Sequence, residues 1–430
     1  MTTEARLLLS PRHRLPNWPY LTDQLPGLGA LVKQRPEDFQ VEEVPQYLCC
    51  GQGDHTYFWV EKTGITTLEL VRRLARHLNR KERDFGYAGL KDSRAVTRQR
   101  MSLEHIEPKI LLDLALPNVK ILSVDRHTNK LKLGHLAGNK FVIKLRRVES
   151  YGKQVAEECL QILQKRGVPN YFGLQRFGVR GDSWIMGKAI IGEDPKEFVD
   201  QFCGRPAPQD RDMVRRAREL YDKGEFELAS EVWPGYFRDA KRACRILAGN
   251  KSSYPRAFAA IDTKLKRLFV SAYQSYLFND VLARRIREID RLEPGDLACK
   301  HVNGAVFLVE DAPVEQARAD GFEISPTGPL FGYRIRLAEG RPGQVEQEVL
   351  TAEALALDDF RKPKGHKVKG SRRPLRVRIK DLAIETGADE HGEFLLLTFE
   401  MPSGAYATAV LRELMKERLL TQDRLTEEGA

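Results

Sequence analysis

Alternation of apolar and polar residues predicts that the chain begins with β-strands. In residues 38–44, the side chains of Phe39, Val41 and Glu43 fall on one side of an extended chain, which is the period of a half-buried strand. Residues 56–62 are rich in aromatic and β-branched side chains and predict a second strand. Alternation returns at residues 139–148 and predicts a third.

Helical periods separate these strands. From Thr67 onwards, apolar residues recur with the spacing of one helix face, which consists of Leu68, Val71, Leu74 and Leu78. A second helix is predicted through Cys159, and Gly167 followed by Pro169 ends it. We therefore expect α+β structure built on a sheet in the first 170 residues.

The pattern changes in the middle of the chain. Helical periods dominate from about residue 178 to residue 370, above all in 214–220 and 265–289. A length of 430 residues also favours two domains over one hydrophobic core. We predict a discontinuous domain interrupted by an inserted α+β domain, with the limits 1–170 and 371–430 for the first and 171–370 for the second.

Strand patterns resume near the end of the chain. Leu375, Val377 and Ile379 alternate with basic residues, so residues 375–380 predict a strand with a basic face. Residues 393–401 are more uniformly apolar and predict a more fully buried strand. A helix through Val410, Leu411, Leu414 and Met415 closes the chain.

Composition excludes some classes of protein. With 42% hydrophobic and 30% charged residues, the chain is typical of a soluble globular protein. No apolar run approaches the roughly 20 residues that span a bilayer. The first residues lack the long apolar stretch of a secretory signal. We expect a cytoplasmic protein that does not enter the membrane.

The six cysteines are scattered along the chain, with no C-x-x-C pair and no cluster of histidines. This spacing predicts neither a zinc site nor a disulfide framework, so we expect reduced thiols and no bound metal. The net charge of +10 and a pI near 9.2 indicate a polyanionic partner. Charge alone does not distinguish RNA from DNA or from an anionic membrane.

The densest motif in the sequence is GYAGLKDSRAVTRQRMSL, at residues 86–103. Its small residues allow a backbone or a ligand to come close. Lys91, Asp92 and Arg94 follow them and place opposite charges on one turn. A carboxylate beside cations is suited to act as a nucleophile or a base. Without further context, an Asp on such a turn is more often a plain surface residue.

Seven blocks of the sequence, spread from residue 33 to residue 414, resemble the TruD family of pseudouridine synthases. The 86–103 motif is similar to the family's signature around its catalytic Asp, which falls on Asp92. The other blocks are KQRPEDFQVEE (33–43), GHLAGNKFVIKLR (134–146), VPNYFGLQRFG (168–178), QSYLFN (274–279), GPLFG (328–332) and MPSGAYATAVLREL (401–414). The last block departs from the family pattern, because Ala405 stands where a Ser is usual; the hydrogen bond of that hydroxyl is worth about 1 kcal/mol.

The resemblance implies a fold and an activity. The fold is an α+β sheet of pseudouridine-synthase type, mostly antiparallel, with the family's inserted domain. The activity is the isomerisation of a uridine of tRNA, uridine 13 in bacterial members, without a cofactor. The catalytic Asp either attacks C1′ of the ribose or takes the C2′ proton. We expect the protein to act on tRNA as a monomer.

The resemblance also assigns roles to individual residues. Asp92 is the catalytic residue, and Lys33 is the cation expected to pair with it. Phe141 and Asn139 lie two positions apart on one strand, so they share a face and suit an aromatic platform and an amide for a flipped base. Phe39, Glu43 and Tyr406 are also assigned to the substrate site, and for Glu43 a plain structural role is equally supported.

RNA contacts are predicted for basic residues at three places. Lys91 and Arg94 flank Asp92. Arg176 lies among aromatic residues, where binding RNA and pinning a hinge between domains are equally supported. The stretch 361–380 holds ten Lys or Arg residues and no acid. Its first half predicts a mobile basic loop with phosphate contacts from Lys362, Lys364, Lys367 and Lys369.

Two other functions fit parts of this pattern. An RNA-binding protein without catalysis would fit the charge, but it does not need Asp92 or Asn139, and both are present. A metal-dependent nucleic-acid hydrolase would need further carboxylates near Asp92 to hold Mg²⁺, and none is spaced nearby. The sequence therefore favours the isomerase.

Overall fold

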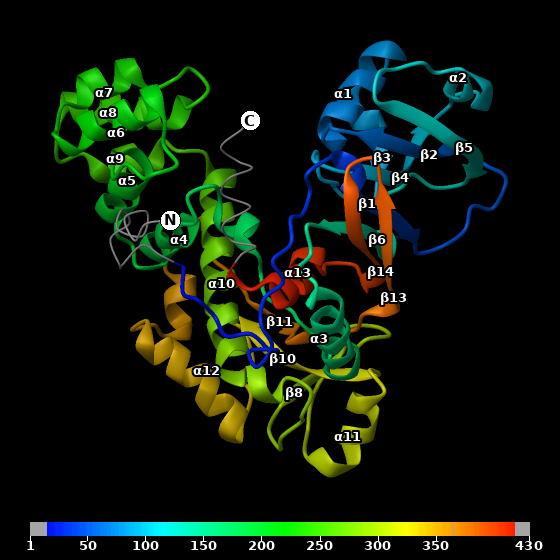
Figure 1. Cartoon of the computed structure of the whole chain (residues 1–430). Coiled ribbons are helices and arrows are strands. Elements are labelled where there is room, and N and C mark those ends of the chain that lie inside the picture. The colour runs from blue at the N-terminus through cyan, green and yellow to red at the C-terminus, as the bar shows by residue number, and fades with distance from the viewer. Residues whose placement is uncertain (1–14, 364, 418–430) are drawn as a thin grey trace. The chain divides into compact units, whose positions relative to one another are not determined.

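The computed structural model describes residues 15–363 and 365–417 (Figure 1). The chain forms two compact units. Among the described residues, the first unit, here the sheet unit, combines 22–168 with 377–417. The second, here the helical unit, combines 15–21 with 169–363 and 365–376. That residues 171–370 are an inserted domain stays a prediction.

The sheet unit is built on an eight-stranded sheet of order β13-β14-β6-β1-β4-β2-β5, with β3 paired to β4 (Figure 1). Only the β1–β4 pair is parallel. The strands are β1 (Phe39–Pro45), β2 (His55–Thr63), β3 (Gly86–Tyr87), β4 (Val96–Glu104), β5 (Val119–His127), β6 (Leu136–Arg146), β13 (Lys380–Asp389) and β14 (Gly392–Pro402). The predicted α+β fold with a mostly antiparallel sheet is confirmed.

Four α-helices and two short 3₁₀-helices belong to the described part of the sheet unit. They are α1 (Thr67–His77), α2 (Pro108–Leu112), α3 (Gly152–Arg166), α13 (Ala407–Met415), η3 (Pro36–Asp38) and η4 (Glu82–Asp84). α1 begins where the Oγ1 of Thr66 accepts a hydrogen bond from the backbone N–H of Glu69 at 3.1 Å, an N-cap worth about 1 kcal/mol.

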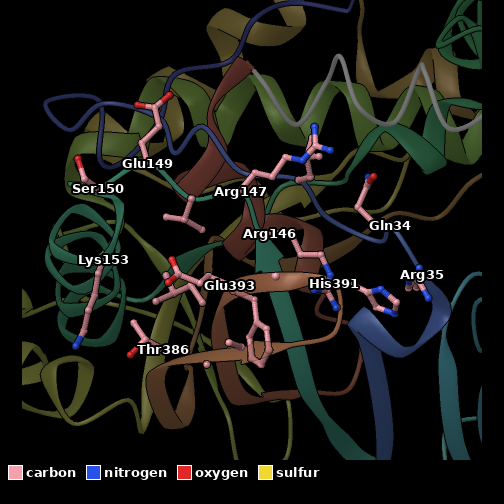
Figure 2. Close-up of a pocket in the computed structure, with 17 residues that line it drawn as sticks. Gln34, Arg35, Arg146, Arg147, Glu149, Ser150, Lys153, Thr386, His391 and Glu393 are labelled. Atoms are coloured by element: carbon pink, nitrogen blue, oxygen red, sulfur yellow. The ribbon is translucent and has the colours of Figure 1, made fainter.

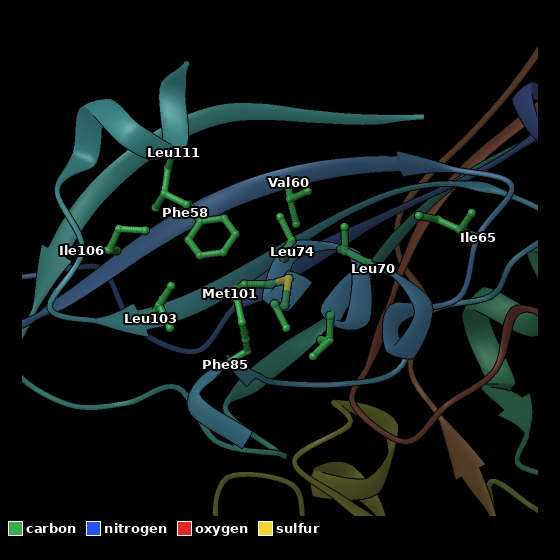
Figure 3. Packing of buried hydrophobic residues seen from close by; sticks show 12 residues of the cluster. Phe58, Val60, Ile65, Leu70, Leu74, Phe85, Met101, Leu103, Ile106 and Leu111 are labelled. Atoms are coloured by element: carbon green, nitrogen blue, oxygen red, sulfur yellow. The ribbon is translucent and has the colours of Figure 1, made fainter. Parts of the chain in front are cut away.

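α1 packs on β2 and β4 through the core shown in Figure 3. Leu70 and Leu74 of the helix lie against Phe58 of β2 and Met101 of β4, and all four are fully buried. Each such side chain contributes about 1.5–3 kcal/mol on burial. The predicted apolar stripe was wrong in one residue: Leu68 is 44% exposed, because the buried face of α1 runs through Leu70.

The register of β1 against β6 fixes which side chains share a face of the sheet. Glu43 is paired with Asn139, and Val41 with Phe141. Directly paired residues point to the same face, and so do alternate residues along a strand. The predicted alternation of β1 is confirmed, since Phe39, Val41 and Glu43 are all buried.

β14 differs from its prediction. Residues 393–401 were expected to form a more fully buried strand, but burial alternates along β14. Leu395, Leu397 and Phe399 are buried, and the residues between them are only partly covered. β14 is paired antiparallel to both β6 and β13. Antiparallel sheets commonly have one face covered by the core and the other open to solvent.

The helical unit consists mainly of helices, with an antiparallel sheet of order β11-β10-β8-β9. Its helices are α4 (Ser183–Ile191), α5 (Pro195–Cys203), α6 (Asp212–Asp222), α7 (Phe226–Val232), α8 (Arg238–Gly249), α9 (Tyr254–Ala259), α10 (Thr263–Arg285), α11 (Ala312–Asp320), α12 (Gly340–Ala352), η5 (Leu174–Phe177), η6 (Ile286–Glu288) and η7 (Leu357–Arg361). Its strands are β8 (Leu297–Lys300), β9 (Val306–Leu308), β10 (Ile324–Leu330) and β11 (Ser371–Pro374).

Where the chain passes between the units lie two short strands, β7 (Val168–Pro169) and β12 (Arg376–Val377). The predicted single strand at 375–380 is wrong, because β12 ends at Val377 and β13 starts only at Lys380. The basic face is wrong at Arg376 too. Its guanidinium is buried, donates to the carbonyl of Ala319 at 2.6 Å and lies over the ring of Phe322.

Candidate active site

The segment that carries Asp92 joins β3 to β4 and is held by its backbone. Lys62 of β2 donates hydrogen bonds from its Nζ to the carbonyl of Asp92 at 2.8 Å and to that of Ile65 at 2.5 Å. The backbone N–H of Lys91 donates to the Oγ1 of Thr67 at 2.9 Å, and this hydroxyl donates to the Oε1 of Gln99 at 2.9 Å. The segment is therefore tied to α1, β2 and β4.

The Asp92 side chain itself stays accessible. It is 46% exposed, and its Oδ2 lies 3.3 Å from the Nζ of Lys33. The same ammonium lies 4.1 Å from the centre of the Phe39 ring. Lys33 adopts a φ of +54°, a left-handed conformation that is uncommon outside glycine and costs about 1–2 kcal/mol. Asp92, Lys33 and Phe39, which the sequence analysis assigned to one site, thus lie together.

Beneath Asp92, Lys91 turns inward and forms a buried ion pair. Its Nζ lies 3.2 Å from the Oε2 of Glu43 and donates to the Oδ1 of Asn139 at 2.6 Å. Burial raises the pKa of the Glu43 carboxyl, and the neighbouring ammonium of Lys91 partly opposes this. The predicted RNA contact of Lys91 stays a prediction, but its side chain is only 5% exposed and its ammonium is bonded within the protein.

The bond from Lys91 orients the amide of Asn139. With the oxygen directed to an ammonium, the NH₂ group is the part of the side chain that can donate to a ligand. Asn139 is half-buried and follows Gly138, where a Cβ would collide with the carbonyl of Met401 in β14. Only glycine allows β6 and β14 to approach this closely, and the close approach fixes the position of Asn139 relative to β14.

Phe141 lies between two other rings on the same face. Its ring centre is 6.3 Å from that of Phe39, edge to face, and 5.3 Å from that of Phe399. Phe141 is 6% exposed, and Phe399 is fully buried. The three rings form an aromatic row beside the Glu43–Lys91–Asn139 cluster.

Lys62 is a charged group that the sequence analysis missed. It is completely buried, and burial lowers its pKa to about 8, while the negative charge of Asp92 acts in the opposite direction. A signal was present in the sequence, because Lys62 alternates with Val60 and Phe58 on the covered face of β2. Thr67, Gln99 and Phe399 were missed as well, although Gln99 belongs to the recognised motif.

Tyr406 and Arg94 lie at exposed positions of the sheet unit. Tyr406 is 45% exposed and directly precedes α13, four residues after Pro402, which pairs with Gly138. Arg94 is exposed in the turn that follows Asp92. Their predicted roles stay predictions.

The other predicted RNA contacts belong to the helical unit. Arg176 is held by α10: its Nε donates to the Oγ of Ser275 at 2.9 Å, and it also bonds to Ser271. Lys362, Lys367 and Lys369 are exposed, and the Nζ of Lys362 lies 2.5 Å from a carboxylate oxygen of Asp359. Lys364 lies outside the described residues.

A cavity of about 780 Å³ opens elsewhere in the sheet unit (Figure 2). It lies at Arg146, seven residues along β6 from Asn139, or about 23 Å on an extended strand. The charge of Arg146 is compensated by Asp38 at 2.6 Å and Asp389 at 2.8 Å, and Arg146 lowers the pKa of Asp389. None of the predicted site residues lines this cavity.

Within residues 15–363 and 365–417, no group of His, Cys, Asp and Glu side chains could hold a metal ion. All six cysteines are free. No helix of this described part is long and apolar enough to cross a membrane.

The chain is similar to known proteins over almost its whole length. The family model of tRNA pseudouridine synthase D (TruD) matches residues 17–414. The tRNA pseudouridine synthase D of Geobacter metallireducens is 47% identical over 397 residues, which are 92% of this chain and 97% of that protein. The one of Thermus thermophilus is 38% identical over 416 residues, 96% of each chain.

A solved structure shows the same fold. It is that of a protein from Methanosarcina mazei assigned as tRNA pseudouridine synthase D (TruD). The TM-score is 0.81 at 30% identity, and the match covers 93% of this chain and 96% of that one.

Proposed function

The chain belongs to the tRNA pseudouridine synthase D (TruD) family, and we propose that it converts uridine 13 of tRNA into pseudouridine with Asp92 as the catalytic carboxylate. The reaction breaks the bond between C1′ and N1, turns the uracil and joins C1′ to C5. N1 gains a proton and C5 loses one, so the product is an isomer and no cofactor is consumed.

The observation that best supports Asp92 as the catalytic residue is that its backbone is held in place while its side chain is accessible. The backbone on either side is tied down by Lys62 and by the Thr67 hydroxyl, yet the carboxylate is 46% exposed. A carboxylate held in this way can reach the ribose of a bound nucleotide without reorganising. Attack on C1′ and removal of the C2′ proton are both within the chemistry of such a group.

Neighbouring residues suit the recognition of a uracil that has left the RNA stack. The NH₂ group of Asn139, directed by Lys91, can donate to a uracil carbonyl. Phe141 supplies an aromatic edge or face beside it, supported by Phe39 and Phe399. Lys33 pairs with Asp92 at 3.3 Å and compensates its charge in the absence of RNA.

For the remaining residues, we propose a contact with the RNA but no particular partner atom. Arg94 and Tyr406, both exposed in the sheet unit, contact the RNA near the target nucleotide. Arg176 and the lysines 362, 364, 367 and 369 of the predicted inserted domain contact phosphates, which position an RNA without reading its sequence. Glu43 and Lys91 orient Asn139, as their buried ion pair supports, and contact the RNA at the edge of this cluster.

Mapping pseudouridine in tRNA from cells with and without the gene tests the proposal. Pseudouridine at position 13 should disappear in the deletion strain and return when the gene is supplied on a plasmid. Other pseudouridines of the same tRNA molecules serve as internal controls and should not change. Retention of pseudouridine 13 in the deletion strain would refute the assignment of the target.

A further inference from the structure

A basic hollow lies at the far end of α1 from the Asp92 segment. It encloses about 680 Å³, and five of its seven lining residues are cations. The α1 basic hollow consists of Arg72, Ala75, Arg76, Arg80, Lys81, Glu82 and Arg83. None of these residues has a part in the proposed reaction.

Most of these cations have no acidic partner. Glu69 pairs with Arg72 at 3.8 Å and with Arg73 at 2.8 Å. Within the described residues, no carboxylate forms an ion pair with Arg76, Arg80, Lys81 or Arg83. Of the lining residues, only Glu82 is acidic.

The spacing of the arginines makes this arrangement unfavourable on its own. Arg72 and Arg76 are four residues apart on α1, so their charges face each other, and such a like-charge pair costs about 0.2–0.5 kcal/mol. Attraction to the negative end of the helix dipole accounts for cations in the last turn. That effect fades beyond the last turn, so it does not explain Lys81 and Arg83. A polyanion bound in the hollow would compensate all five charges.

Hydrogen bonds tie the segment that carries the hollow to its neighbours. The backbone N–H of Lys81 donates to a carboxylate oxygen of Asp84 at 3.0 Å, and Arg80 donates to the carbonyl of His105 at 3.0 Å. The Nζ of Lys130 donates to the carbonyl of Arg83 at 2.6 Å. Ala75, which lines the hollow, and Phe85 both belong to the hydrophobic core of α1, β2 and β4. The cations are thus presented on a fixed surface.

α1 connects this surface to the Asp92 segment. Its first residue, Thr67, accepts the hydrogen bond from the N–H of Lys91, and Arg76 follows nine residues later. At 1.5 Å per residue, these positions are about 14 Å apart along the helix. At about 3.4 Å per nucleotide along one strand of a duplex, this distance corresponds to a few nucleotides.

We propose that the α1 basic hollow binds the phosphates of the substrate RNA a few nucleotides from the base that enters the site. This inference rests on the proposed function. The contacts are to phosphates, so they add affinity and fix the position of the RNA but do not read its sequence. Their contribution weakens as salt is added, because the cations of the protein displace counterions that are bound to the RNA phosphates.

The test measures binding of two RNAs by a charge-removing variant. Arg76→Gln, Arg80→Gln and Arg83→Gln are combined, and fluorescence anisotropy gives the affinity over a salt series. For full-length tRNA, affinity should fall, and the log–log salt slope should drop by about 0.7–0.9 for each phosphate that the variant no longer neutralises. A short RNA containing only the target uridine and its immediate neighbours should bind the variant and the wild type equally well. Turnover at saturating tRNA should be unchanged.

Two matched variants serve as controls. Arg76→Lys, Arg80→Lys and Arg83→Lys together keep the charge and should keep the salt slope. Lys120→Gln, Lys140→Gln and Lys153→Gln together remove the same charge from exposed positions elsewhere in the sheet unit and should leave affinity near that of the wild type.

Three results would overturn the inference. They are wild-type affinity and salt slope in the first variant, an equal loss in the Lys120, Lys140 and Lys153 variant, and an equal loss for the short RNA. Thermal unfolding of each variant shows that it is folded. A wild-type protein that forms no pseudouridine in any tRNA would instead refute the proposed function, while the binding data would still report on the hollow.

Discussion

The charged side chains around Asp92 and the exposed lysines of the basic segment, Lys362, Lys367 and Lys369, meet very different surroundings. Lys91 is 5% exposed and reaches Glu43 and Asn139, and Lys62 is completely buried against two backbone carbonyls. By contrast, Lys362 is 58% exposed, and its ion-pair partner Asp359 precedes it by only three residues.

The two groups of charges are suited to different roles. Removing a charge from water costs several kcal/mol, so a buried ammonium persists only where specific partners surround it. Such groups hold other residues in place, and their loss changes geometry. Exposed cations cost little and exchange partners readily, so they are suited to phosphates and their effect depends on salt.

The largest effect on stability is expected from breaking the buried pair. Lys91→Met leaves the Glu43 carboxylate buried without its ammonium, and the loss of one partner of a buried pair costs about 3–5 kcal/mol. Pseudouridine formation should also fall, because the Asn139 amide loses its orientation. Urea unfolding and tritium release from 5-labelled uridine measure the two effects. The double variant Glu43→Gln, Lys91→Met should recover part of the stability, and a loss below about 1 kcal/mol in Lys91→Met would contradict the importance of burial.

A smaller effect, confined to turnover, is expected for the aromatic row. Phe141→Ala would create a cavity worth about 3–5 kcal/mol, so Phe141→Leu is the better test because it removes the ring and keeps most of the volume. Turnover should fall far more than tRNA affinity. Phe58→Leu, in the equally buried core of α1 and β2, is the matched control and should keep its turnover. If both variants turn over like the wild type, Phe141 is only a core residue.

The buried ammonium of Lys62 predicts a dependence of stability on pH. Its pKa in the folded protein is about 8, below the usual value of 10.5, so between these values the unfolded chain binds more protons than the folded one. The free energy of unfolding of the wild type should therefore rise with pH in this window, relative to Lys62→Met. The slope of the difference is at most about 1.4 kcal/mol per pH unit for one proton. Urea unfolding of both proteins at several pH values measures it, and a difference that does not change with pH would show that Lys62 keeps its ordinary pKa.

The smallest effect on catalysis is expected from the basic segment. Replacing Lys362, Lys364, Lys367 and Lys369 with Ala should weaken binding to all tRNAs alike and lower the salt slope by about 0.7–0.9 for each phosphate that these lysines neutralise. Turnover at saturating tRNA should hardly change, because Asp92 and Asn139 are untouched. Anisotropy titrations at several salt concentrations measure this, and unchanged affinity would identify the segment as a solvated loop.

Much of the fold around the site could be predicted from the sequence. Alternation placed Phe39 and Glu43 on one buried face, and the motif at 86–103 pointed to Asp92. The burial of Lys62 was indicated only by its alternation with Val60 and Phe58. A lysine or arginine alone indicates a solvated surface, and the buried Arg376 shows that this indication can be wrong. Both can be buried because a backbone carbonyl distant in the sequence accepts a hydrogen bond from each. Lys62 donates to the carbonyl of Asp92, and Arg376 donates to that of Ala319.

In the proposed mechanism, the exposed carboxylate of Asp92 performs the chemistry and its surroundings position it. Tritium release from 5-labelled uridine in tRNA, measured for Asp92→Asn and the wild type, tests this most directly. The substitution keeps the shape of the side chain and removes one partly exposed ion pair, which is worth at most about 1 kcal/mol of stability. The variant should fold and bind tRNA as the wild type does, with a rate lower by about four orders of magnitude or more. A rate within about tenfold of the wild type, a change of only about 1.4 kcal/mol in the barrier, would contradict the account.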